Sequence, residues 1–472
     1  MSRRVVVTIA SELSFDLNSI TADAMLEIRR QFRYKNPAFQ KAKAMGYVAL
    51  NEPKHYDCYS EKNGRVTVWR GGAKRLREIL ESTGHKVGYI DRRLTLKETG
   101  LDLGQLKPFD YQEPAIEALL RFQQGILRGH TGSGKTETLL AAAVRSQQPA
   151  LIQVWNKDLL KQWADRIIKY GILKEHQIGL IQGSKNKFGP ITLGMIQSLN
   201  KRVDQWKDKF GCVIVDECQR TPATTFIKGV TPFSARYRWG GSADETRKDG
   251  KHFLLYEAMG YQEWSIRGDK VSFHPVYEIE GRGQSLDPTL VIVPTSYQDE
   301  AFENDRNFGQ LINRLVADQG RNRLIARLLK KQLEKGRQVI LFTERVDAAL
   351  YWSNIVSSWN YEASPLIGGQ EHADQTTAGI RRLREGKCRF ASTTSYADVG
   401  LDVPSLDTAF ITCPMSKNIK RMNQQIGRIV RPHDGKQDPI AFYFWDRDVS
   451  GVSKGIRSVK DRWKKHVMLG ED

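Results

Sequence analysis

Residues 129–136 read GHTGSGKT, and this glycine-rich stretch lies between a short apolar run and a segment of helix-forming composition. Glycines let successive backbone N–H groups point toward one centre, and the positive end of a following helix adds to their field. The pattern therefore predicts a loop that holds the phosphates of a nucleoside triphosphate, with Lys135 on the outer phosphates and the Thr136 hydroxyl on Mg²⁺. The residues that we assign to the nucleotide here are Thr131, Gly132, Ser133, Gly134, Lys135 and Thr136.

Length and charge narrow the class of protein. The 472 residues are enough for about three domains. Lys and Arg number 73 against 54 Asp and Glu, a formal net charge of +19, so a polyanion is the expected partner, nucleic acid first and an anionic membrane surface second. No run approaches the ~20 apolar residues of a membrane span, and the N-terminus lacks the apolar segment of a secretory signal. We expect a soluble monomer without a membrane partner.

Cysteine usage favours a reducing compartment. The five cysteines are an odd number and include no CxxC pair, which argues against a structural zinc site and against a disulfide framework. The expected location is the cytoplasm.

Beyond residue 105, short apolar runs alternate with amphipathic stretches, which is typical of parallel α/β sheets. A polar, charged region around Glu280–Asp318 interrupts the series, so we predict two sheets, in residues 101–283 and 284–472. The basic segment Ser453–Met468 is interpreted as a solvated helical face, with a DNA-facing tail as the alternative. The predicted strands are Leu151–Trp155, Ile191–Met195, Val213–Val215, Val339–Phe342, Phe390–Ser392 and Ala409–Ile411.

Residues 1–100 read as a small α+β domain. Val5–Ala10 suggests a strand, Thr21 can cap a helix that runs to about Phe32, and the Asn63-Gly64 step predicts a hairpin. A further amphipathic helix is expected over residues 73–82. The segment holds 19 Lys and Arg against 11 Asp and Glu, a net charge of +8, with aromatic residues interleaved. Such a domain suits nucleic acid, although the aromatic rings are also what a small core needs. The aromatic residues are Tyr34, Phe39, Tyr47, Tyr56 and Trp69.

A carboxylate pair follows one of the predicted strands. Val213–Val215 is apolar and ends directly in Asp216 and Glu217. At the carboxyl end of a strand and downstream of a phosphate loop, such a pair can divide two tasks. Asp216 would hold Mg²⁺ through water, and Glu217 would orient and activate the attacking water.

These motifs occur in an order that resembles superfamily 2 helicases. The chain has Phe109–Gln112 before the phosphate loop, then Asp216–Gln219, Ser242–Asp244 and Gln424–Arg431. Within that superfamily it is similar to XPB-like and bacteriophage UvsW-type DNA helicases. The resemblance implies two tandem RecA-like parallel-sheet domains behind a small basic DNA-binding domain, with ATP and Mg²⁺ as cofactors.

The resemblance also implies roles for single residues. Gln112 matches the glutamine that reads the adenine edge, with Phe109 or Tyr111 beside the base, and Asp402 after Gly400 would face the nucleotide. Contacts to the nucleic-acid backbone are implied for Lys157, Gln197, Ser198 and Thr394.

The sixth motif supplies the remaining catalytic candidates. Gln424, Arg428 and Arg431 match it, and the two arginines would reach the γ-phosphate as arginine fingers. Taken without the family, two arginines three residues apart on a helix can equally form a solvated basic face.

Four positions depart from the family pattern. Met195 lacks the hydroxyl often found two residues before Gln197, so that backbone contact is expected to be weaker or differently made. Asp244 replaces a hydroxyl in the third motif, which puts the coupling of ATP hydrolysis to strand separation in question. Gln219 replaces a common histidine and can still bridge to Ser242, because an amide both donates and accepts. Asn156 replaces a threonine beside Lys157, so that backbone contact is expected to differ.

The function that these residues imply is an ATP-dependent DNA helicase or translocase on forked or branched DNA. By resemblance, we expect 3′→5′ travel in replication, recombination or repair, and the host cytoplasm as location if the chain is of phage origin. One alternative is an RNA helicase, because the motifs contact the backbone and say little about the sugar. Another is a duplex translocase that does not unwind, or the motor subunit of a restriction system; the sequence has no recognisable nuclease motif, which argues against a self-contained restriction enzyme. A nucleotide-gated switch without catalysis is the third, and the intact catalytic residues argue against it.

Overall fold

The computed structural model describes most of the chain. The described residues are 3–45, 53–129, 133–220, 223–242, 249–260, 276–278, 286–305, 307–369, 371–394, 401, 403–414, 420–449, 452, 456, 459–460 and 466–469. The chain divides into two compact units: the first is Met1–His130 with Gly134–Gly281, and the second is Arg282–Asp472 with Thr131–Ser133. Each unit is described by itself.

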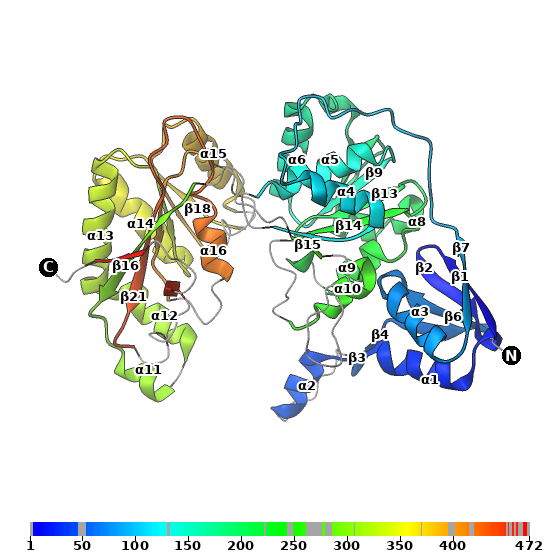
Figure 1. The fold of residues 1–472 in the computed structure, drawn as a ribbon. Coiled ribbons are helices and arrows are strands. Elements are labelled where there is room, and N and C mark those ends of the chain that lie inside the picture. Colours follow the sequence, from blue (N-terminus) through cyan, green and yellow to red (C-terminus); the bar gives the residue numbers. More distant parts are fainter. Residues whose placement is uncertain are drawn as a thin grey trace. The chain divides into compact units, whose positions relative to one another are not determined.

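The N-terminal part of the first unit is a five-stranded sheet with two helices on one face (Figure 1). Residues that alternate along β1 and β2, such as Val5, Val7, Leu13 and Phe15, form its core together with apolar residues of the helices. The strands, in the order of the sheet, are β5 (Tyr59–Lys62), β6 (Arg65–Trp69), β2 (Glu12–Asp16), β1 (Arg4–Ile9) and β7 (Lys86–Asp91), and the helices are α1 (Ala22–Gln31) and α3 (Ala73–Ser82).

Local predictions in this part are confirmed, with one exception. The Thr21 hydroxyl accepts from the N–H of Ala24 at 3.3 Å, and Asn63 and Gly64 form the hairpin turn with φ values of 51° and 70°. The exception is the predicted hairpin arm Tyr56–Glu61: the arm begins at Tyr59, and Tyr56 lies in β4 (His55–Asp57), which pairs with β3 (Arg33–Lys35). The chain changes sheet at the buried Cys58, whose N–H donates to the carbonyl of Phe32 and whose carbonyl accepts from Trp69. A second short helix, α2 (Pro37–Ala44), follows β3.

The second sheet of this unit has eight strands, and all pairs are parallel except β10 with β11. In Figure 1 the helices α4 (Glu113–Phe122), α5 (Lys135–Arg145) and α6 (Lys157–Lys169) lie on one side of it, and α9 (Ala223–Val230) and α10 (Phe253–Met259) on the other. Two short helices, α7 (Ile196–Asn200) and α8 (Val203–Trp206), complete the unit. The strand order is β11 (Lys185–Lys187), β10 (Gly179–Gln182), β12 (Ile191–Met195), β9 (Ala150–Val154), β13 (Cys212–Val215), β14 (Tyr237–Ser242), β8 (Gln124–Arg128) and β15 (Val276–Glu278).

The second unit is a seven-stranded parallel sheet. Both faces are buried, because neighbouring residues of one strand enter different cores: Ile340 and Phe342 enter one cluster, and Val339 and Leu341 enter the other. The strand order is β18 (Ala363–Leu366), β19 (Phe390–Thr393), β17 (Val339–Phe342), β20 (Thr408–Ile411), β21 (Ile440–Asp446), β16 (Thr289–Thr295) and β22 (His466–Met468). The helices are α11 (Glu300–Asp305), α12 (Phe308–Ala317), α13 (Gln319–Glu334), α14 (Val346–Ser358), α15 (Ala373–Arg384) and α16 (Lys420–Ile426). The predicted α/β class with two parallel-sheet domains is confirmed.

Two interpretations of this unit were wrong. The polar region between the sheets contains β16, whose Leu290, Ile292 and Val293 are buried between β21 and β22. Polar neighbours on both sides had hidden this strand. The segment Ser453–Met468, predicted as a helical face, is helical at the described residues Ile456, Val459 and Lys460, but the prediction is wrong at its end, where β22 pairs in parallel with Leu290–Ile292. The residues of β22 form a strand because they pair with the edge of β16, a strand that is far away from them in the sequence.

Among the described helices, none combines the length and the apolar composition that a membrane crossing requires.

Two buried arginines join the N-terminal sheet to the eight-stranded sheet. Arg238 of β14 donates to the carbonyls of Ser11 and Ala258, each at 3.0 Å. Arg70 donates to the carbonyl of Ala235 at 2.7 Å and to Oε1 of Gln124 at 2.9 Å. Burial lowers the pKa of Arg238 to about 10 and lowers the pKa of Arg70 as well. Backbone carbonyls and one side-chain amide oxygen therefore accept from these guanidinium groups where water cannot reach them.

A buried acid joins the same two parts. Glu257 of α10 is fully buried, accepts from the hydroxyl of Tyr34 at 2.5 Å and pairs with Arg75 of α3. Burial raises the pKa of Glu257, and the charge of Arg75 opposes that shift. Close by, a Cβ atom on Gly71 would lie 2.1 Å from the carbonyl oxygen of Tyr256, so only glycine lets the backbones approach this closely.

We expect Glu257→Ala to lower the free energy of unfolding by about 3–5 kcal/mol, because it leaves the largely buried Arg75 without its anion. The control is Glu61→Ala, which breaks the exposed pair with Arg29 and is expected to change stability little. Urea denaturation followed by circular dichroism measures both. Equal effects of the two substitutions would show that the Glu257 contact does not hold the two parts together.

Candidate nucleotide and nucleic-acid site

The end of the phosphate loop is shaped by one glycine. Gly134 has a φ of +77°, and Lys135 opens α5 directly after it. A Cβ atom on Gly134 would lie 2.3 Å from Nε2 of Gln112, so neither the backbone angle nor the space allows a side chain. Lys135 donates to the carbonyl of Gly129 at 2.8 Å. Ser133 is buried, whereas Thr131 and Gly132 lie outside the described residues.

Gln112 connects the loop to the segment before it. Its side chain is buried, Nε2 donates to the carbonyl of Gly134 at 3.1 Å, and Oε1 accepts from the N–H of Phe109 at 2.9 Å. The rings of Phe109 and Tyr111 stack with centroids 5.5 Å apart, and Phe109 is exposed. The structure thus brings the predicted adenine-contact residues to the phosphate loop.

Asp216 occupies the carboxyl end of β13, as predicted, and is buried. Its Oδ2 accepts from Nε1 of Trp163 at 2.8 Å, and its Oδ1 accepts from the N–H of Glu217 at 2.9 Å. Burial raises the pKa of Asp216, the Glu217 charge adds to the shift, and Trp163 and Lys135 oppose it. A buried carboxylate that is held ionised by two donors and a nearby ammonium is suited to a cation.

Glu217 has the left-handed conformation, with a φ of +48°. Left-handed backbone is uncommon for a residue other than glycine and concentrates at functional sites. Oε2 of Glu217 accepts from Nε2 of Gln219 at 2.6 Å, and Oε1 of Gln219 accepts from the Ser242 hydroxyl at 2.7 Å. The expected bridge from Gln219 to Ser242 is therefore present. Asp244 lies outside the described residues.

Sequence reasoning missed Trp163 and Gly241. Trp163 repeats with Leu159 and Ile167 on the buried face of α6, and its indole N–H was the available signal, since a buried indole usually finds an acceptor. Gly241 of β14 leaves room for the acid: a Cβ atom there would lie 3.1 Å from Oδ1 of Asp216 and 2.8 Å from Leu139.

The predicted nucleic-acid contacts of the first unit follow two adjacent parallel strands, β9 and β12. Lys157 and Gln197 are exposed, and Nε2 of Gln197 donates to the carbonyl of Trp155 at 3.1 Å. The hydroxyl of Ser198 accepts from the N–H of Gly183 at 3.0 Å. Asn156 caps α6 by accepting from the N–H of Leu159 at 2.8 Å, so this departure from the family pattern has a structural role beside Lys157.

In the second unit, the predicted nucleotide-site and nucleic-acid residues differ in how far they are buried. Arg428 is buried and donates to the carbonyl of Leu401 at 3.0 Å, whereas Arg431 is partly exposed. Gln424 is partly buried on α16, and Thr394 directly follows β19. Gly400 and Asp402 lie outside the described residues. The role of the two arginines as fingers stays a prediction.

The residues present fit a nucleotide with Mg²⁺. Thr136 stands in the first turn of α5, and Asp216 lies close enough for the Lys135 charge to affect its pKa. Within the described ranges, no group of three or more His, Cys, Asp or Glu forms a ready-made metal cage. Few protein ligands are typical of Mg²⁺, which keeps its waters and binds substrate phosphates.

Two family models match the chain in succession. Residues 105–242 match the model described as "Type III restriction enzyme, res subunit", and residues 320–433 match "Helicase conserved C-terminal domain". The chain is accordingly an ATP-dependent helicase of superfamily 2, and its two parallel sheets belong to RecA-like domains.

Within that superfamily the chain resembles XPB-like and phage helicases. The "DNA 3'-5' translocase XPB2" of Sulfurisphaera tokodaii is 25% identical over 357 residues, which cover 69% of this chain and 79% of that protein. The "ATP-dependent DNA helicase uvsW" of Enterobacteria phage T4 is 23% identical over 386 residues, covering 77% and 72%. In fold, the chain resembles Saccharomyces cerevisiae Dbp5 bound to RNA and ADP BeF3, with a TM-score of 0.53, 14% identity and coverage of 77% and 90%.

We expect Trp163→Phe to lower the rate of ATP hydrolysis about tenfold at saturating ATP. A hydrogen bond to a charged group contributes about 1.5–3 kcal/mol, and roughly 1.4 kcal/mol corresponds to a factor of ten. The control is Trp206→Phe, which removes a similar indole hydrogen bond, to Asn186 at 3.0 Å, without touching Asp216. A steady-state ATPase assay compares them. If Trp206→Phe slows hydrolysis equally, the loss reflects packing and not the support of Asp216.

Proposed function

We propose that this chain is a DNA helicase that travels 3′→5′ on forked or branched DNA, in replication, recombination or repair. The observation that carries the proposal is the arrangement at the carboxyl end of β13. There the buried Asp216 and the left-handed Glu217 lie beside Lys135, which opens the helix after the phosphate loop. The similar proteins XPB2 and uvsW are named for action on DNA, which supports DNA as the substrate. The name of XPB2 also gives a 3′→5′ direction, which supports the polarity. We further propose a monomer that works in the cytoplasm, that of the host if the chain is of phage origin.

In the proposed hydrolysis, Lys135 and the loop N–H groups hold the phosphates, with Phe109, Tyr111 and Gln112 at the base. Thr136 and Asp216 would hold Mg²⁺, which neutralises charge on the outer phosphates when it is bound. Glu217 accepts the proton of the attacking water, and Gln219 keeps its carboxylate in place at 2.6 Å.

The remaining nucleotide and DNA contacts are proposed from the motif positions. Arg428 and Arg431, with Gln424, would stabilise the charge on the γ-phosphate, and Gly400 and Asp402 would line the nucleotide site. Lys157, Gln197, Ser198 and Thr394 would contact the DNA backbone, which positions the strand without reading its sequence.

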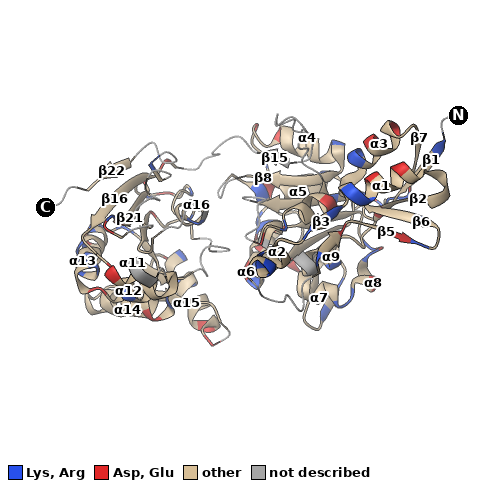
Figure 2. Cartoon of the chain, turned by 90° about the horizontal axis from the view of Figure 1, so that it is seen from below, with Lys and Arg blue, Asp and Glu red and all other residues tan. Residues whose placement is uncertain are grey.

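A cluster of exposed lysines supports a role for residues 1–100 in DNA binding. Many basic residues there are paired with acids, as in Arg29–Glu61, Arg33–Asp57 and Arg77–Glu81, and Figure 2 shows both signs of charge on α1 and α3. The exception is a set of lysines on or beside β3, α2 and β4. Here four exposed lysines form no ion pair with another described residue, and they define what we call the basic arm: Lys35, Lys41, Lys43 and Lys54.

The base of the basic arm packs on α10. Tyr34 stacks on Phe253 with ring centroids 4.3 Å apart, and Tyr56 lies 6.0 Å from the same ring. Since α10 follows the third-motif segment, DNA held by the arm is connected by packed side chains to the part of the motor that bears Ser242.

A second candidate function is a duplex translocase that does not unwind. The similar protein XPB2 is named a translocase, which favours this second function. Displacement of a labelled strand from a fork separates the two functions, because a pure translocase hydrolyses ATP without releasing the strand.

We expect forked or four-way-junction DNA to stimulate ATP hydrolysis more than matched RNA does. Glu217→Gln is expected to lower the stimulated rate at least about a hundredfold, because general-base assistance contributes roughly 10²–10⁴-fold. The variant should still bind a fluorescent ATP analogue, since the phosphate contacts remain. The measurement is a coupled ATPase assay on each nucleic acid. Equal stimulation by RNA would reassign the substrate, and hydrolysis by Glu217→Gln at the native rate would remove Glu217 from its role.

We expect Lys41→Glu with Lys43→Glu to weaken DNA binding and to reduce the slope of log K against log salt by about 2, since each phosphate contact contributes about 0.9. Lys331→Glu with Lys335→Glu is the matched control, because both lysines are exposed in the second unit and the net charge changes equally. Fluorescence anisotropy across a salt series gives the slopes. Equal loss in both double variants would mean that overall charge, and not the arm, binds DNA.

A further inference from the structure

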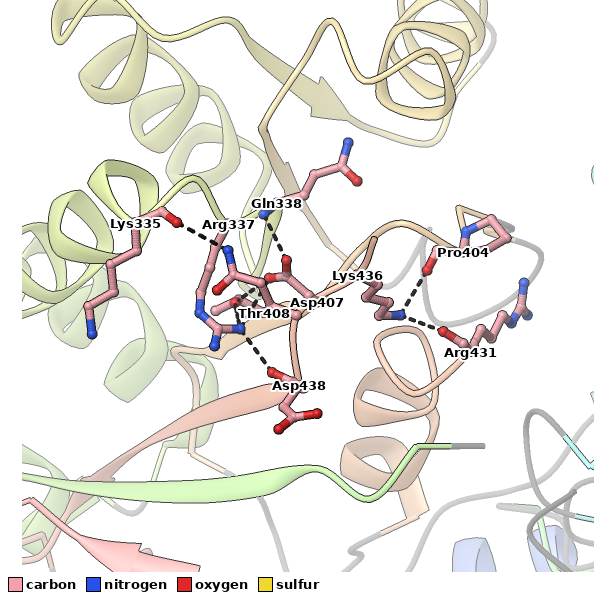
Figure 3. A network of polar contacts seen from close by, with 10 residues as sticks. Lys335, Arg337, Gln338, Pro404, Asp407, Thr408, Arg431, Lys436 and Asp438 are labelled. Carbon is pink, nitrogen blue, oxygen red and sulfur yellow. Dashed lines mark hydrogen bonds and ion pairs between the residues drawn. The ribbon is translucent and has the colours of Figure 1, made fainter. Parts of the chain in front are cut away.

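Lys436 lies in the turn between the sixth motif and β21. Its Nζ donates to the carbonyl of Arg431 at 2.6 Å and to the carbonyl of Pro404 at 2.8 Å, as Figure 3 shows. Gly435 just before it has a φ of +72°, which lets the chain turn back toward Arg431. The ammonium is partly buried. One cation therefore joins two backbone segments that are 27 residues apart in the sequence.

A second contact joins the same two segments. The guanidinium of Arg428 donates to the carbonyl of Leu401 at 3.0 Å. The segment around Leu401 and Pro404 belongs to the fifth motif and its continuation, and Arg428 and Arg431 belong to the sixth. The two motifs are thus tied once through a side chain of the sixth motif and once through Lys436.

Further hydrogen bonds hold the residues that follow Lys436 in this turn. Arg337 donates to the carbonyl of Asp438 at 2.9 Å and pairs with Asp407 at 3.5 Å, in the network of Figure 3. Gln437 donates to the carbonyl of Lys335 at 3.1 Å. Because the residues on the C-terminal side of Lys436 are anchored to the starts of β17 and β20, movement of its ammonium is restricted.

We propose that Lys436 is a positioning residue for ATP hydrolysis: it locks the backbone of Arg431 to Pro404 and so fixes where the Arg431 guanidinium points. The inference rests on the proposed role of Arg431 at the γ-phosphate. An ammonium has three donors and no acceptor, which suits it to two carbonyl groups at once. Methionine is unbranched like lysine, is one atom shorter and cannot donate, whereas arginine can donate at any accessible pH.

Two charged groups act on Lys436, the carboxylate of Asp407 and the guanidinium of Arg431. Burial lowers the pKa of Lys436 to about 8, Asp407 opposes that shift and Arg431 adds to it. Above about pH 8 the ammonium loses its proton, and its two hydrogen bonds lose the assistance of the charge. The sign for stability is opposite: between the folded pKa and the normal value the unfolded chain binds the proton, so stability rises with pH. A fall in hydrolysis through this range is therefore not a fall in folding.

The test is the steady-state ATPase rate of the full chain with forked DNA between pH 6.5 and 9.5. Lys436→Met is expected to lower kcat roughly tenfold to a hundredfold with little change in KM, since small misplacements of a catalytic group have effects of this size. We expect the wild-type kcat to fall above about pH 8, and this fall should be absent in Lys436→Met. Lys436→Arg should restore most of kcat and move the fall to higher pH. Lys335→Met is the control, because only the carbonyl of Lys335 takes part in the network.

A second experiment uses Arg431→Ala. If Lys436 acts through Arg431, Lys436→Met has no further effect on kcat in the Arg431→Ala background. Independent losses in the double variant, or a normal kcat in Lys436→Met, overturn the inference while the DNA-stimulated wild-type rate keeps the proposed function intact. A normal kcat in Arg431→Ala overturns both the finger role and this inference. A wild-type chain that DNA does not stimulate overturns the proposed function itself.

Discussion

The site depends on a constraint of the sheets: a parallel sheet buried on both faces leaves only its strand ends for polar chemistry. Within β13 and β17 every side chain is buried. Asp216 and the phosphate loop follow β13 and β8, Ser242 ends β14 between them, and Lys157 and Gln197 follow the next two strands. The predicted phosphate, carboxylate and DNA-contact residues therefore gather at the carboxyl edge of this sheet, because its buried faces leave no room for them.

A second constraint is the way the N-terminal sheet is attached. Arg70, Arg238 and Glu257 are each almost fully removed from water and hydrogen-bonded across the junction. Removing one partner while the junction stays closed would leave a buried charge uncompensated, which is costly in a way that the loss of an apolar contact is not. The first unit consequently behaves as one body, with the basic arm and the third-motif strand on a common support.

Much of this could be predicted from the sequence, because local signals and tertiary structure agree. The strands Ile191–Met195 and Val339–Phe342 match their apolar runs, and Asp216 follows its strand as expected. The prediction failed where distant parts decide. Trp163 reads as an ordinary core residue until β13 brings Asp216 to its indole, and β22 forms only because β16 offers an edge. The left-handed backbone of Glu217 has no sequence signal, since glutamate does not favour it.

The grip of the backbone on Gln112 has a consequence for the choice of base. Phe109 N–H occupies one lone pair of Oε1, and the carbonyl of Gly134 occupies one N–H of Nε2, so the amide cannot rotate by half a turn without setting donor against donor and acceptor against acceptor. If Gln112 meets the base as proposed, a purine finds one acceptor and one donor in a set order. Discrimination between bases would then depend on an amide whose orientation is fixed by the protein's own backbone.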